Sequence, residues 1–120
     1  MATIKSFTDL SQSKTLSTIL PLESADMVYI ATTNDDIGDY LYTAMHKSEF
    51  IIREDDEDCI PCWSLAALLN VLPYPILCKK SDNTWGVDLW VDNKFYCTYA
   101  SYKIDACYEM ILKLNELKML

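Results

Sequence analysis

The sequence predicts a single α+β domain that spans residues 1–120. Hydrophobic residues make up 51% of the chain, a proline-bounded apolar helix stands near its centre, and strand-like patterns surround that helix. This composition argues against disorder, and the length suits one hydrophobic core. We expect an antiparallel sheet packed by a short central helix and a C-terminal helix, in the order α-β-β-(β)-α-β-β-β-α.

The central helix is predicted from leucine spacing and from the prolines around it. The i, i+3, i+4, i+7 pattern of one helix face is met by Leu65, Leu68, Leu69 and Leu72. Pro61 presets φ for the first turn, Ser64 can cap it and Pro73 ends it, which predicts a helix over 63–71. A membrane span needs about 20 residues of continuous helix. Because the prolines divide this apolar run, no membrane contact is expected.

The N-terminal half reads as one surface helix followed by strands. Thr8 or Ser6 is the expected N-cap of a helix over 9–20, which Pro21 ends. Patterns rich in β-branched and aromatic residues predict strands over 26–32, 39–45 and 50–53. The acidic run 54–58 is expected to be a solvated loop.

The C-terminal half reads as three strands, over 74–80, 85–91 and 95–100, and a helix over 103–117. A three-residue loop at 92–94 puts the apolar residues of both hairpin strands on one face, whereas a two-residue loop would add Lys94 and Thr98 to it. We therefore predict the three-residue loop. The apolar face would then carry Val87, Leu89, Val91, Phe95, Cys97 and Tyr99. The opposite face would carry Asp88, Trp90, Tyr96 and Thr98.

Composition excludes several function classes. The net charge of −8 disfavours direct binding to nucleic acid, because phosphate contacts depend on clustered Lys and Arg. Gly38 and Gly86 are the only glycines, too few for a glycine-rich phosphate loop. The first residues lack the apolar region of a secretory signal, and five cysteines are an odd number for a disulfide framework. These features predict a cytoplasmic protein with reduced thiols.

The motif Cys59-Ile60-Pro61-Cys62 is the sharpest chemical signal. A C-x-P-C at a helix N-terminus resembles the thioredoxin-like redox motif, in which the helix end lowers the thiol pKa. Here five acidic residues, 54–58, precede the motif and disfavour a thiolate, and the following prolines come too early for that family. The alternative interpretation of Cys59 and Cys62 is two small residues where the helix begins.

Other catalytic or cofactor sites find little support. A C-x-x-C pair supplies only two of the four ligands of a structural zinc site. His46 precedes the cysteines, so it is not placed as the base of a papain-like amidase, and one histidine supports no serine triad. We expect no cofactor and no metal, and the sequence favours a non-enzymatic function.

Trp90 and Tyr96, predicted on the outer hairpin face, are the candidate interaction residues. Aromatic side chains on a polar face often mark an interface, because they bury much area while few rotamers become fixed. The alternative is that a helix covers this face as well. A partner could be another protein or a second copy of the chain.

Three segments, 61–69, 105–111 and 20–27, resemble small uncharacterised proteins encoded by gut-bacterial genomes, prophages and mobile elements. The segments read Pro-Cys-Trp-Ser-Leu-Ala-Ala-Leu-Leu, Asp-Ala-Cys-Tyr-Glu-Met-Ile and Leu-Pro-Leu-Glu-Ser-Ala-Asp-Met. The resemblance implies an accessory role in a bacterium or phage, and it assigns no functional residue. The leading hypothesis is an interaction protein. The alternatives are a thiol-active redox protein and an acidic mimic of nucleic acid.

Overall fold

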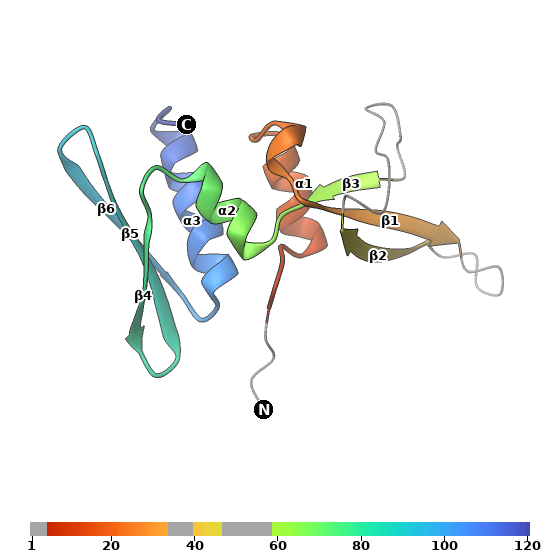
Figure 1. The fold of residues 1–120 in the computed structure, drawn as a ribbon, viewed down its shortest axis with the longest axis horizontal. Helices are drawn as coiled ribbons and strands as arrows, with labels where there is room; N and C mark the ends of the chain where they lie inside the picture. The colour runs from red at the N-terminus through yellow and green to blue at the C-terminus, as the bar shows by residue number, and fades with distance from the viewer. Residues whose placement is uncertain (1–4, 34–39, 47–58) are drawn as a thin grey trace.

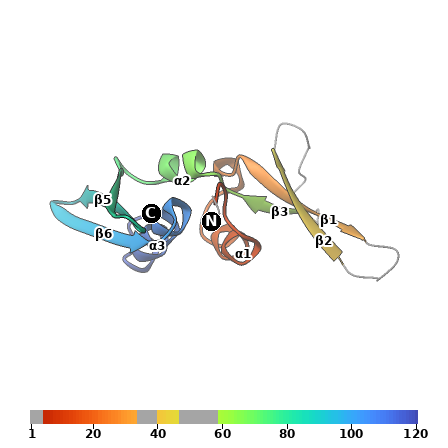
Figure 2. The same ribbon diagram turned by 90° about the horizontal axis from the view of Figure 1, so that it is seen from below.

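The fold, taken from a computed structural model, places two small antiparallel sheets on either side of three helices (Figures 1 and 2). The structure describes residues 5–33, 40–46 and 59–120. The elements in chain order are α1 (Leu10–Ser17), the 3₁₀ turn η1 (Leu22–Ser24), β1 (Met27–Thr33), β2 (Tyr40–His46), β3 (Cys59–Cys62), α2 (Leu65–Val71), β4 (Ile76–Ser81), β5 (Thr84–Val91), β6 (Lys94–Ala100) and α3 (Lys103–Glu116).

The α+β class and the order of elements are confirmed, but the single expected sheet is two sheets. One has the order β2-β1-β3 and the other β4-β5-β6, and all neighbouring strands are antiparallel. Helix α3 packs against β5, β6 and α2, whereas α1 packs against β3. The strand expected over 50–53 and the acidic run 54–58 lie outside the described residues.

The main core lies between the C-terminal sheet and the helices. Its largest contributor by side-chain size is Trp63, which is buried together with residues of α1, α2, β5 and α3. The helix predicted over 103–117 is confirmed as α3. Its apolar stripe is buried from Ile104 to Leu114, whereas Leu117 lies beyond the last turn and is half exposed. Burial of such apolar faces supplies the main driving force for this arrangement.

The N-cap of α1 differs from the prediction. Asp9, rather than Thr8 or Ser6, accepts a hydrogen bond from the Gln12 N–H at 2.8 Å, and the Gln12 side chain accepts from the Asp9 N–H. This reciprocal pair is a capping box. Thr8 is instead buried, with its hydroxyl 2.8 Å from the Ser13 hydroxyl. The predicted cap of α2, Ser64, is confirmed, since its side chain accepts from the Ala67 N–H.

The register of the C-terminal hairpin shows that the predicted three-residue loop is wrong. Val91 pairs with Lys94, so the turn has two residues, and both Asp92 and Asn93 have positive φ, 51° and 65°. Positive φ at both central positions defines a type I′ turn, whose twist matches that of the flanking strands. Every side chain of β6 therefore faces the side opposite to the one predicted.

We expect Asn93→Val to lower the free energy of unfolding by about 1–2 kcal/mol, because a β-branched side chain is strained at positive φ. Asn93→Gly should leave the stability equal or slightly higher, since glycine favours this turn position. Urea unfolding of the two variants checks this. Equal stability of the valine and glycine variants would contradict the two-residue turn.

Candidate functional site: the outer face of the C-terminal sheet

The face of the C-terminal sheet that points away from α3 carries exposed aromatic side chains. Trp90 is 64% exposed, Phe95 51% and Tyr99 58%, and Ile76 of β4 is 58% exposed on the same face. The Trp90 and Phe95 rings are cross-strand neighbours, with centroids 5.3 Å apart. Below, "the outer face" means these four residues together with Cys78, Lys80, Gly86, Asp88 and Cys97.

Of the two predicted interaction residues, the structure places one on this face and one beneath it. Trp90 lies on the outer face, as expected. Tyr96 instead faces the helices, where it packs against the core, and Lys113 of α3 approaches its ring at 5.8 Å. Phe95 takes the outer position that the three-residue loop assigned to Tyr96. The Asp92-Asn93 pair was the sequence signal for the two-residue turn, because Asp and Asn tolerate the positive φ that such a turn requires.

One ion pair crosses the outer face. Lys80 donates to Asp88 at 2.8 Å, and its amine also lies 5.7 Å from the centre of the Tyr99 ring. The Lys80 stem runs directly over Gly86, because a Cβ added to that glycine would lie 2.6 Å from the Lys80 Cε. The hydrogen bond from Lys80 is the main reason why the pKa of Asp88 lies below its ordinary value. The central charges of this face are thus paired with each other.

The C-x-P-C motif is in a strand rather than at the start of a helix. Cys59–Cys62 forms β3, with Cys62 opposite Met27 and Cys59 opposite Ile30 of β1. Residues three positions apart in a strand point to opposite faces, about 10 Å apart. A disulfide needs Cα atoms within about 7 Å. The two cysteines therefore lack the geometry of a thioredoxin-like pair.

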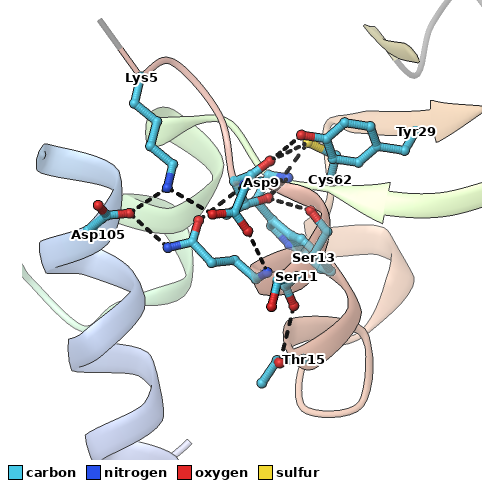
Figure 3. Close-up of polar contacts among 11 residues, drawn as sticks. Lys5, Asp9, Ser11, Ser13, Thr15, Tyr29, Cys62 and Asp105 are labelled. Carbon is cyan, nitrogen blue, oxygen red and sulfur yellow. Dashed lines mark hydrogen bonds and ion pairs between the residues drawn. The ribbon is translucent and has the colours of Figure 1, made fainter. Parts of the chain in front are cut away.

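Cys62 is buried in a polar cluster (Figure 3). Its thiol lies 3.5 Å from the Thr8 carbonyl oxygen, which also accepts from the Tyr29 hydroxyl at 2.7 Å. Burial raises the pKa of Cys62, which is the opposite of what a reactive thiolate requires. All five cysteines are described, and none is in a disulfide.

A second polar cluster joins the N-terminal segment to α3 (Figure 3). Lys5 donates to Asp105 at 2.7 Å and to Asp9 at 3.2 Å, and Gln12 donates to Asp105 at 2.7 Å. Burial opposes the charge on Lys5, but the two carboxylates outweigh it and raise the pKa of Lys5. These residues line a cleft of about 660 Å³ that runs beside the end of β6. Sequence reasoning missed this cluster because Lys5 and Asp105 are 100 positions apart.

Comparison with known proteins gives no family for this fold and face. No family model matches the chain, and neither the curated proteins nor the solved structures contain a significant match. Within the ranges that the structure describes, no cluster of three or more His, Cys, Asp or Glu side chains is placed to hold a metal ion. None of the described helices is both long and apolar enough to cross a bilayer.

Proposed function

We propose that this chain is a non-enzymatic interaction protein that binds another protein or itself through the outer face. The observation that carries the proposal is the cross-strand pair of Trp90 and Phe95, both more than half exposed on adjacent strands of the sheet. Large exposed aromatics anchor many interfaces, and contiguous exposed apolar groups are unusual on a monomer. Because Lys80 and Asp88 are paired with each other, covering this face costs less than burying either charge alone would.

The setting of this function comes from the resemblance of the 61–69, 105–111 and 20–27 segments to proteins of gut bacteria, prophages and mobile elements. It adds to the proposal an accessory role inside a bacterial cell. The redox alternative is not favoured by the strand geometry of Cys59 and Cys62. The acidic-mimic alternative needs carboxylates spaced like phosphates on one face, and half of the acidic residues lie outside the described ranges.

The double substitution Trp90→Ser with Phe95→Ser tests the proposed face. Because both side chains are exposed, we expect the fold to persist, with a stability loss of at most about 1 kcal/mol from the lost cross-strand pair. Association should weaken at least about tenfold. The measurements are sedimentation velocity for self-association, and titration with a partner captured from a bacterial lysate and then purified.

Tyr74→Asn is the matched control for this experiment. Tyr74 is 95% exposed but lies outside the outer face, at a positive φ of 47° that asparagine tolerates. This variant should fold and bind like the wild type. If the double variant keeps the wild-type affinity both for itself and for every captured partner, the outer face is not the interaction surface.

A further inference from the structure

Strand β6 is an edge of the C-terminal sheet, and one side of its backbone is unpaired. Val91 and Lys94 close the two-residue turn and are therefore a hydrogen-bonded pair. Alternation along the ladder then directs the N–H and C=O groups of Phe95, Cys97 and Tyr99 away from β5. Within the described part of the chain, these groups have no backbone partner outside the hairpin. Such an edge is a template for another strand.

The cleft beside the end of β6 has a surplus of negative charge. Cys97–Ala100 forms one wall, and Lys5, Asp9, Asp105 and Glu109 are among the residues of the other. Lys5 is already shared between Asp9 and Asp105, and Glu109 is exposed and forms no ion pair with a described residue. A strand that paired with β6 would therefore be favoured if it brought a cationic side chain to the position beside Ala100.

The chain itself carries this cation at the opposite end of the same strand. Lys94 is exposed, forms no ion pair with a described residue, and has the same facing as Ala100 in β6. If two β6 strands run antiparallel about a two-fold axis at Cys97, Lys94 stands opposite Ala100 of the second copy. Its amine then enters the negative cleft of that copy, and the reverse contact forms by symmetry.

The same register satisfies the free backbone groups and the aromatic side chains. Phe95 pairs with Tyr99 of the second copy and Cys97 with its own counterpart, and each pair exchanges both N–H···O bonds. Aromatic side chains directly opposite each other across strands stabilise such pairing. The outer faces of the two copies would then form one continuous aromatic surface on a six-stranded sheet.

The distribution of charge favours this mode of self-association. Residues 1–58 contain twelve acidic and four basic residues, whereas residues 59–120 contain six of each. The segment that forms the C-terminal sheet and α3 is therefore neutral overall, although the whole chain carries −8. Two copies can meet through this segment without bringing together parts of the chain that carry surplus like charge.

We propose that two copies of the chain pair antiparallel through β6, with Lys94 of each copy bound at the acidic cleft of the other near Glu109. The occupant of the β6 edge is thus a second copy rather than an extended segment of another protein. This inference rests on the proposed function in taking the C-terminal sheet as the interaction surface. It adds the edge, the register and the charged contact.

A charge exchange tests the contact. K94E and E109K should each reduce self-association at least tenfold in sedimentation velocity, because each homodimer then has two like-charged contacts. An equimolar mixture of the two variants should dimerise again, because both contacts in the mixed dimer join opposite charges. K79E, which changes the charge equally on β4 at the other edge of the sheet, should dimerise like the wild type.

A crosslinking experiment tests the register. A short bismaleimide should join two copies through Cys97, which lies on the axis, so Cys97→Ser should abolish the covalent dimer. Cys78→Ser should not, because Cys78 lies on β4. A wild-type chain that stays monomeric, a mixture that fails to dimerise, or a crosslink that survives Cys97→Ser would each overturn the proposal.

The two proposals can fail separately. K94E and E109K leave Trp90 and Phe95 in place. If the charge exchange fails but binding of a partner still depends on Trp90 and Phe95, only the β6 dimer is ruled out. The opposite outcome has two parts: the charge exchange works as expected, and W90S changes neither the dimer nor the binding of any other partner. This outcome supports the β6 dimer and removes the function proposed for the outer face.

Discussion

Replacing Trp63 with alanine is expected to lower the free energy of unfolding by about 3–5 kcal/mol, a large part of the stability of a small domain. Trp63 is fully buried and is the largest such side chain in the described core. Its indole N–H donates to the Ser24 hydroxyl at 2.9 Å, and its carbonyl accepts from the Thr8 N–H at 2.9 Å. The substitution leaves a cavity and removes one hydrogen bond.

Trp90→Ala is the matched control, because the same side chain is removed from an exposed position. Its stability should stay within about 0.5–1 kcal/mol of the wild type, and Trp63→Phe should fall between the two. Urea unfolding with a common m value gives all three differences. Equal losses for Trp63→Ala and Trp90→Ala would contradict the placement of the core.

Stability is expected to fall steeply in alkaline solution. Burial raises the pKa of Cys107 from 9.0 to about 12, and burial also raises the pKa of Tyr29 from 10.0 to about 12. Between pH 9 and 12 the unfolded chain releases these protons while the folded chain retains them, so rising pH favours unfolding. Below pH 8 both states are protonated and the effect vanishes. Cys107 alone should cost roughly 2 kcal/mol at pH 10.5.

Two variants separate these contributions to the pH dependence. Cys107→Ala should lower the stability at pH 7, because it leaves a cavity, but the decline above pH 9 should become shallower. Tyr29→Phe should reduce the decline only above pH 10. The measurement is the slope of the free energy of unfolding against pH from 8 to 11.5, from urea unfolding under reducing conditions. Unchanged slopes in both variants would show that neither group titrates as its burial implies.

The five predictions probe different levels of the structure. Trp63→Ala and the alkaline decline test the packing of the core and the region around Tyr29, and the Asn93 variants test the local backbone of one turn. The aromatic double variant and the charge exchange test surfaces that contribute little to folding. Loss of association without loss of stability would therefore separate function from fold.

Local patterns in the sequence predicted the three α-helices and all of the described strands except β3, whose residues were expected to lead into the central helix. The leucine spacing of α2, the apolar stripe of α3 and the strand patterns of β1 and β2 agree with the structure to within one or two residues. Each of these signals is a periodicity contained within one element. Trp90 was also placed on the correct face, because its facing follows from the apolar alternation of β5 alone.

The apolar pattern could not predict the register of the hairpin, because β6 carries aromatic residues on both faces. Phe95 and Tyr99 point outward, whereas Tyr96 packs toward the core, so alternation gives no clear choice of the inner face. The turn decided the register through the positive φ values of Asp92 and Asn93. The register also determines that the backbone groups of Phe95, Cys97 and Tyr99 lie at the free edge of β6, where another strand can pair with them.

The sequence by itself determined an acidic α+β chain with a leucine-rich helix at its centre and an aromatic hairpin after it. Only the tertiary structure decided that the sheet is split in two, that Pro61 stands in β3 rather than opening α2, and that Lys5 meets Asp105. The physical reason is the range of the interactions. Helix periodicity and capping act within a few residues, whereas strand pairing, burial of Cys62 and the acidic cleft depend on partners far along the chain.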